Sequence, residues 1–102
     1  MNVTISARHC EIPDSLRLAT ERRIARLRRY NPRLADAEVT YEVERVNHEV
    51  EIRLAVDGEP PVVARAAADN FRAALDRGLD RASRQLRRAR ERRRERSVTP
   101  TP

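Results

Sequence analysis

The most constraining feature of the sequence is a helical pattern that runs from Asp69 to Arg96. Small and apolar residues recur there at spacings of three and four, the period of one helical face. They are Phe71, Leu75, Gly78, Leu79, Ala82, Leu86 and Ala89. A side-chain oxygen of Asp69 or Asn70 can accept a hydrogen bond from the first backbone N–H groups, so one of the two is expected to be the N-cap. The helix would be roughly 40 Å long and would pack one face on a core.

The same stretch carries the net charge of the whole chain. Residues 77–102 hold ten arginines against three acidic residues, and residues 1–76 hold twelve against thirteen. Basic residues recur at helical spacing at Arg77, Arg81, Arg84, Arg88 and Arg92. Solvated helix faces usually mix both signs, and this one scarcely does. The pattern predicts a polyanionic partner, with nucleic acid ahead of an acidic membrane surface, because guanidinium groups bind phosphate in a bidentate manner.

Length and cysteine usage limit the class of protein. The chain has 102 residues, enough for one domain with one modest core. Its only cysteine, Cys10, excludes an internal disulfide. The N-terminus does not have the pattern of a signal peptide, and no apolar run approaches membrane-spanning length. We therefore expect a cytoplasmic protein with one domain over residues 1–96, and a disordered tail or the start of a linker over 97–102.

The N-terminal part predicts a strand followed by a basic helix. Residues Asn2–Ala7 alternate between polar and apolar, as in a half-buried strand. Pro13 suits the first turn of a helix that we expect over Asp14–Tyr30, and Asn31–Pro32 should end it. Its buried stripe would be Leu16, Thr20, Ile24, Leu27 and Tyr30. Seven arginines against one acidic residue between positions 16 and 33 make this helix basic as well.

Three further strands are expected between the two helices. Residues Ala37–Arg45 alternate strictly, a hairpin turn is expected at Val46–His48, and a second alternating strand runs from Glu49 to Val56. The turn signal Asp57–Gly58 precedes a last strand over Val62–Ala67. The predicted fold class is therefore α+β with the order β-α-β-β-β-α. It is a four-stranded sheet with two helices packed on one face, similar to a double-stranded-RNA-binding domain.

The solvent face of this sheet is expected to be acidic. Residues 34–76 hold ten acidic residues against four arginines. The carboxylates on the exposed phase are Glu38, Glu42, Glu44, Glu49 and Glu51. No run of exposed aromatic side chains is available for stacking bases, because Tyr41 lies on the buried phase. A polyanion would therefore be met by the helices and not by the sheet.

Catalytic and metal-binding signatures are weak. The sequence has no glycine-rich phosphate loop, GxSxG, CxxC or HExxH motif. His9, Cys10 and Glu11 are adjacent, but neighbouring residues of an extended segment point in different directions, so we expect a plain connection there. His48 is expected to be a turn residue, and Asp76 and Asp80 to be part of a salt-bridged surface. We predict no enzyme, no cofactor and no metal site.

Several segments resemble one known family. They are RHCEIPDSLR before the first helix, RRIARL inside it, VERVNH at the hairpin and LDRGLDRASRQLRRAR in the last helix. Together they resemble the ribosome hibernation promoting factor family, also called ribosome-associated inhibitor or ribosomal subunit interface proteins. The resemblance covers residues 1 to about 96, and the last-helix pattern is its most specific part. The chain departs from the family at Asn70, Phe71 and Arg72, and at Pro60–Pro61.

The resemblance implies a stress or stationary-phase factor that binds the small ribosomal subunit and its rRNA. Such a protein would block the mRNA and tRNA channel and inhibit translation, without a membrane or a small-molecule substrate, and as a monomer in isolation. The residues that position and helical spacing nominate for RNA binding are Arg8, His9, Arg22, Arg23, Arg26, Arg29, Arg77, Arg81, Arg84, Arg88 and Arg90. The family has short forms and long forms with an added C-terminal domain, and both remain open for this chain.

Two other functions are compatible with the residues. One is a general RNA-binding module without preference for ribosomes, which the arginine stripes alone would support. The other is a regulator of transcription that acts by binding a protein partner, an older idea about the same family. The first would bind any RNA at matched salt, whereas the second would keep its partner when salt screens the helices.

Overall fold

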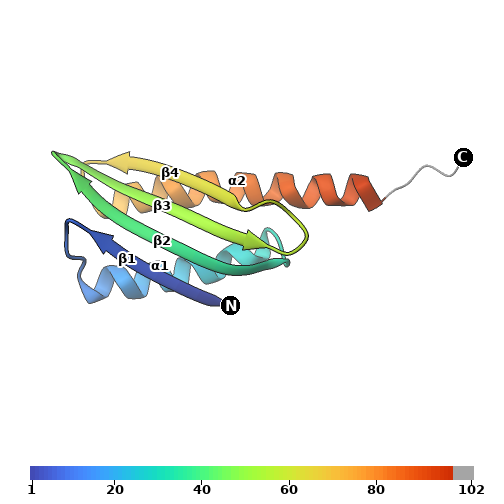
Figure 1. Ribbon diagram of the computed structural model, residues 1–102, viewed down its shortest axis with the longest axis horizontal. Coiled ribbons are helices and arrows are strands. Elements are labelled where there is room, and N and C mark those ends of the chain that lie inside the picture. Colours follow the sequence, from blue (N-terminus) through green and yellow to red (C-terminus); the bar gives the residue numbers. More distant parts are fainter. Residues whose placement is uncertain (98–102) are drawn as a thin grey trace, which may run out of the picture.

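The computed structural model describes residues 1–97 as one four-stranded sheet with both helices on the same face (Figure 1). The chain order is β1 (Asn2–Arg8), α1 (Asp14–Arg26), the 3-10 turn η1 (Leu27–Arg29), β2 (Leu34–Glu44), β3 (Asn47–Val56), β4 (Val62–Ala68) and α2 (Phe71–Ser97). The α+β class and the order β-α-β-β-β-α predicted from the sequence are confirmed. Figure 1 also shows that α2 extends beyond the end of the sheet.

The strands lie in the sheet in their chain order, β1-β2-β3-β4. β1 pairs with β2 in parallel, while β2, β3 and β4 form an antiparallel meander. A parallel pair needs a long crossover, and α1 with η1 provides it. One row across the sheet shows the register: Ile5, Val39, Ile52 and Ala64 are successive partners. The row places one apolar side chain of each strand on the face that the helices cover.

The core lies between the sheet and the two helices. Val39, Ile52, Leu54 and Leu86 are fully buried. Gly78 lies where α2 approaches β3 closely, because a Cβ at this position would lie 3.0 Å from Cγ1 of Val50 and 3.1 Å from Cδ1 of Ile52. A side chain at position 78 would push α2 away from β3. The predicted helix face is thus confirmed, and its glycine has a packing function.

A buried polar contact joins α1 to β2. The Thr20 hydroxyl donates to the backbone oxygen of Leu16 at 2.7 Å and lies 2.6 Å from the Tyr41 hydroxyl. Because its own proton is directed to Leu16, Thr20 accepts the hydrogen bond from Tyr41. Both side chains are fully buried. Burial raises the pKa of the Tyr41 phenol, although the hydrogen bond to Thr20 opposes that shift.

The helix boundaries differ from the sequence expectation in small ways. The α-helical part of the first helix ends at Arg26, and its last turn tightens into η1 instead of continuing to Tyr30. Asn70 is the N-cap of α2, since its Oδ1 accepts from the N–H of Ala73 at 2.9 Å. α2 includes Ser97, although the sequence predicts a tail or linker from this residue onwards. The other residues of that predicted tail lie outside the described part of the chain.

The β2–β3 hairpin corrects the prediction for His48. The connection comprises only Arg45 and Val46, with Arg45 at a φ of 58°. Two-residue hairpins favour such positive φ angles, because the turn then follows the twist of the strands. His48 lies within β3 opposite Val43 and packs edge-on against Phe71, with ring centroids 4.8 Å apart. His48 is therefore a half-buried packing residue and not a turn residue.

Candidate nucleic-acid interface

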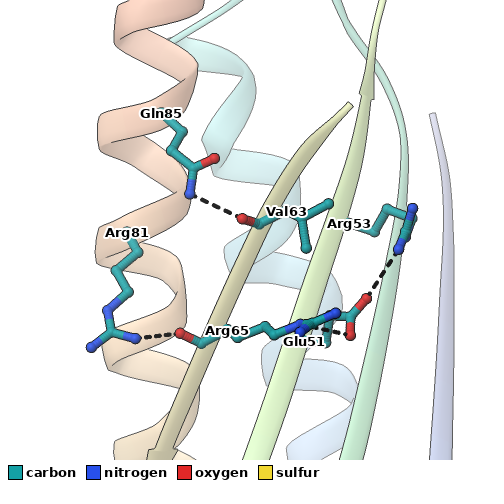
Figure 2. A network of polar contacts seen from close by, with 6 residues as sticks. All are labelled: Glu51, Arg53, Val63, Arg65, Arg81 and Gln85. Carbon is teal, nitrogen blue, oxygen red and sulfur yellow. Dashed lines mark hydrogen bonds and ion pairs between the residues drawn. The ribbon is translucent and has the colours of Figure 1, made fainter. Parts of the chain in front are cut away.

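Side chains on one side of α2 form hydrogen bonds with the backbone along the outer edge of β4 (Figure 2). Side chains four residues apart on the helix donate to backbone carbonyls two residues apart on the strand. The bonds join Arg77 to Ala67 at 2.7 Å, Arg81 to Arg65, and Gln85 to Val63 at 3.0 Å. Four helical residues rise about 6 Å and two strand residues about 6.6 Å, so the two spacings match along the edge. The predicted arginine stripe therefore contributes to the fold.

Arg77 and Arg81 remain exposed although they bind the strand. A guanidinium has five N–H donors, and each of these two bonds uses Nη1 only. The two residues therefore have a structural contact in addition to their predicted contact with RNA. Sequence spacing could not separate these two functions, because it shows which residues share a helix face but not which element lies beside that face.

The side of α2 that faces α1 begins with carboxylates. Asp76 forms an ion pair with Arg23 of α1, and Asp80 with Arg84 one turn further along α2 at 2.5 Å. These pairs confirm the predicted salt-bridged surface at Asp76 and Asp80, and the Arg23 partner adds a link between the helices. The groove at this junction has a volume of about 300 Å³. Arg23 and Arg84, both nominated for RNA binding, therefore already have a carboxylate partner.

Further along the same side, Tyr30 lies between the two helices. The Cζ of Arg29 is 4.8 Å and the Cζ of Arg87 4.4 Å from the centroid of the Tyr30 ring. Nη2 of Arg29 also donates to the Tyr30 hydroxyl at 2.8 Å. The sequence reasoning nominated Arg29 but missed Arg87. Asp76, Asp80, Ser83 and Arg87 follow one another at helical spacing and so share one side of α2. That spacing is the only sequence signal for the contact of Arg87 with Tyr30.

Four of the nominated arginines on the helices are uncommitted within the described part of the chain. Among residues 1–97, no hydrogen bond or ion pair involves Arg22, Arg26, Arg88 or Arg90. Arg22, Arg26 and Arg88 are also exposed, and Arg90 is half-buried. These side chains can bind phosphate without first giving up an intramolecular partner. The four residues belong to α1 and to the C-terminal half of α2, and both helices lie on the same face of the sheet (Figure 1).

Arg8 and His9 lie apart from this group. Arg8 lines a hollow of about 850 Å³ that is also formed by outward-facing residues of β2, β3 and β4. That location is the open face of the sheet, opposite the core face. His9 follows at a φ of 56° and is exposed. Among the nominated arginines of the helices, Arg81 alone lines the same hollow as Arg8, so the structure places Arg8 apart from the others.

The open face of the sheet is less acidic than the sequence suggested. Glu38, Glu42, Glu49 and Glu51 line the hollow as expected. Arg53 and Arg65 lie among them, and both bind Glu51, at 3.4 Å and 3.2 Å (Figure 2). Charges of both signs therefore occur on this face. The sequence count of residues 34–76 summed the acidic residues correctly but could not show that two of the four arginines neutralise one of them.

The adjacent residues His9, Cys10 and Glu11 do not converge. The Cys10 thiol lies 3.7 Å from the backbone oxygen of Tyr41 and donates to it, whereas His9 and Glu11 are exposed. Within the described residues, no three or more His, Cys, Asp or Glu side chains are grouped closely enough to hold a metal ion. None of the helices in that part of the chain combines the length and the apolar character needed to cross a membrane.

Comparison with known families identifies the relationship. The model of the family described as "Sigma 54 modulation protein / S30EA ribosomal protein" matches residues 3–94. The chain belongs to this family. A relative named ribosome hibernation promoting factor, from Azotobacter vinelandii, is 34% identical over 102 residues, which is 100% of this chain and 94% of that protein. A second relative with the same name, from Pseudomonas putida, is 32% identical over 91 residues. The match spans 89% of this chain and 88% of that protein.

Two solved structures have the same architecture. A ribosomal subunit interface protein from Coxiella burnetii matches with a TM-score of 0.83 over 89% of this chain and 99% of that one. Its 16% identity supports the shared fold alone. The N-terminal domain of Thermus thermophilus Protein Y matches with a TM-score of 0.78 at 30% identity, over 86% and 98% of the two chains. The sequence resemblance to this family is thereby confirmed.

Proposed function

We propose that the protein is a hibernation factor that binds the small ribosomal subunit and inhibits translation. The carrying observation is that two arginine-bearing helices cover one face of the sheet, with Arg22, Arg26, Arg88 and Arg90 uncommitted to any intramolecular hydrogen bond or ion pair within residues 1–97. Membership in a family whose relatives are named ribosome hibernation promoting factors supports this function. The protein acts as a cytoplasmic monomer in this proposal.

The proposed mechanism is steric and involves no chemical step. The arginines of α1 and α2 bind phosphates of the small-subunit rRNA, and the bulk of the domain fills the channel that mRNA and tRNA use. Phosphate contacts supply affinity and orientation without reading sequence. With six to ten such contacts, affinity falls by roughly a thousandfold or more between low and moderate salt. The ribosome would contribute the specificity through the shape of the channel.

Co-sedimentation with purified ribosomes and separated subunits tests this function. We expect saturable binding, close to one protein per small subunit, that resists free ribosomal RNA as a competitor. Addition of mRNA together with tRNA should displace the protein, because the ligands would occupy the same channel. Binding that is unsaturable, or that persists undiminished beside bound mRNA and tRNA, contradicts channel occupancy.

A charge-reversal variant tests which surface makes the contact. Arg26→Glu, Arg88→Glu and Arg90→Glu together should abolish ribosome binding, because the proposed contacts with phosphate depend on their positive charge. The fold should survive, because these arginines have no intramolecular ion pair to lose. Arg45→Glu, Arg53→Glu and Arg65→Glu make the control, with the same change of net charge on the strands and their hairpin, although Arg53 and Arg65 give up their ion pairs with Glu51. Circular dichroism should show both variants folded. Equal loss of binding in the two variants would show that only the net charge matters.

Two alternatives give different outcomes in the same assays. A general RNA-binding module would bind any duplex or single strand as well as ribosomes at matched salt. The family description also names modulation of sigma 54, which favours a regulator that binds a protein partner. Such a partner would remain bound at salt concentrations that release RNA, and the arginine reversals would affect it little.

A further inference from the structure

Arg29 and Arg87 are held together by an aromatic ring and not by a carboxylate. Both guanidinium carbons lie within 5 Å of the Tyr30 centroid, at 4.8 Å and 4.4 Å, although the residues come from different elements. Within residues 1–97 neither side chain has an acidic partner. The two guanidinium carbons are therefore at most about 9 Å apart. Two positive charges within that distance repel each other, and the contact with the ring offsets only part of the repulsion.

This arrangement differs from that of two other arginines on the helical side. Arg23 and Arg84 have carboxylate partners in Asp76 and Asp80, so binding an external anion would compete with an ion pair already formed. At Arg29 and Arg87 an anion would instead relieve an existing repulsion. Each guanidinium retains donors for it, because the ring contacts use the π face and the hydrogen bond from Arg29 to the Tyr30 hydroxyl uses Nη2 only.

Hydrogen bonds of the buried residue next to Tyr30 fix the position of this site. Asn31, the residue after Tyr30, is 2% exposed and donates from Nδ2 to the backbone oxygen of Leu86 at 3.1 Å. Its Oδ1 accepts from the N–H of Arg33 at 3.0 Å. Residues 30 and 31 are therefore fixed against residues 86 and 87 of α2. A fixed pair of cations loses less conformational entropy when it binds a ligand than two independent side chains do.

We propose that Arg29 and Arg87 form one phosphate-binding site that spans the junction of η1 and α2. Its ligand is a phosphodiester group of RNA, which both guanidinium groups contact at once. Tyr30 is a positioning residue: it holds the two arginines in place and does not itself bind the phosphate. The inference rests on the proposed function. It adds Arg87 to the proposed RNA-binding surface, with Tyr30 as the residue that positions it.

A double-mutant cycle on ribosome affinity tests the shared site. Arg29→Ala and Arg87→Ala should each weaken binding by about tenfold, the effect of one charge-assisted hydrogen bond. The double variant should lose clearly less than the product of the two, because each arginine strengthens the contact of the other. Arg28→Ala removes the same charge from η1 and is the matched control. An Arg87→Ala loss no larger than that of Arg28→Ala, or effects that multiply fully, overturns the shared site.

Variants of Tyr30 test the positioning role. Tyr30→Leu should weaken binding by several fold while the slope of log affinity against log salt stays unchanged, because both charges remain. Arg87→Ala should instead reduce that slope by about one. Tyr30→Phe keeps the ring contacts and should recover most of the affinity. If Tyr30→Leu binds as well as the unaltered protein, Tyr30 does not position the arginines.

A measurement without ribosomes separates this proposal from the proposed function. Isotope-labelled protein is titrated with inorganic pyrophosphate while the Nε–H resonances of arginine are followed by NMR. We expect saturable shifts at Arg29 and Arg87 that exceed those at Arg28, and their loss in Tyr30→Leu. Equal, unsaturated shifts at all three arginines overturn the site. Shifts at the two arginines in a protein that fails to bind ribosomes would support the site and reject the proposed function.

Discussion

The guanidinium of Arg77 donates a hydrogen bond to the backbone carbonyl of Ala67 at 2.7 Å, and this contact is the first of three along the edge of β4. An edge strand exposes carbonyl and N–H groups that can pair with a strand of another molecule. In this protein, side chains of α2 occupy the outward carbonyls of Val63, Arg65 and Ala67. At the opposite edge of the sheet, Arg17 of α1 donates a hydrogen bond to the carbonyl of Ile5 in β1 at 3.2 Å. Helical arginines thus cover both edges.

Removing the side chains along β4 should expose this edge. The triple variant Arg77→Ala, Arg81→Ala and Gln85→Ala should be destabilised by about 1–2 kcal/mol, since the three hydrogen bonds are partly solvated. It should also associate with itself at concentrations where the unaltered protein is monomeric. Urea unfolding and sedimentation velocity measure the two effects.

Arg88→Ala with Arg92→Ala is the control for that variant. Both residues lie further along α2 and form no hydrogen bond or ion pair among the described residues. The control should therefore retain its stability and remain monomeric. A triple variant that stays monomeric at all concentrations would show that the edge is protected by other means.

The raised pKa of Tyr41 predicts a loss of stability at alkaline pH. The phenol of an unfolded chain has a pKa of about 10, and burial raises it in the folded protein. The folded state therefore binds this proton more tightly, and its stabilising effect is complete below pH about 10. Stability should fall as the pH rises from there through the folded pKa. Chemical unfolding at a series of alkaline pH values measures this.

Tyr41→Phe provides the comparison for the pH series. It removes the ionisable group and the hydrogen bond to Thr20, so it should cost about 1 kcal/mol near neutral pH. Its stability should then depend less on pH than that of the unaltered protein in the alkaline range. Parallel curves for the two proteins would mean that other groups control alkaline unfolding.

The close approach at Gly78 predicts intolerance of a branched side chain. Gly78→Val would insert methyl groups where a Cβ alone already lies 3.0 Å from Val50 and 3.1 Å from Ile52. Overpacking of this kind costs about 2–3 kcal/mol. Denaturant unfolding should show that loss, with Ala73→Val on the same helix as a milder reference. An unchanged midpoint for Gly78→Val would mean that α2 can move away from β3 freely.

Asn31 should be among the most sensitive polar residues. Asn31→Asp keeps the oxygen that Arg33 requires but replaces the donor to Leu86 with a second acceptor. A buried carboxylate facing a carbonyl oxygen should destabilise the protein by about 3 kcal/mol, and Asn31→Ala by about 2 kcal/mol. Thermal unfolding measures both. If Asn31→Asp were the milder variant, the bond to Leu86 would not hold the helices together.

Much of the fold follows from local periodicity. Strict alternation in Ala37–Arg45 predicted β2, and the apolar stripe through Leu75, Leu79 and Leu86 predicted α2, because each element must bury one face. The positions of segment ends were less certain. The hairpin was predicted one residue too long, since the pairing of His48 with Val43 depends on a partner strand and not on the residues of the turn.

The arginines show the limit of sequence reasoning about the site. Helical spacing grouped Arg77, Arg81, Arg84 and Arg88 on one face, and all four are indeed on α2. It could not show that the first two bind β4, because these partners are set by how α2 lies on the sheet. The pair of Arg84 with Asp80 is different, because the two residues are four apart on one helix and their contact follows from that spacing. It also missed Arg87, whose neighbour Tyr30 is far away along the chain.

The sequence by itself determined the fold class, the order of the elements and the presence of two basic helices, since hydrophobic period and charge are local properties of the chain. Only the tertiary structure decided which arginines are available. That depends on long-range contacts, such as those of Arg23 with Asp76 and of Tyr30 with Arg87, which form when α1 and α2 come together over the same sheet. A guanidinium has the same charge in every position, and its neighbours decide whether it binds the protein or a phosphate.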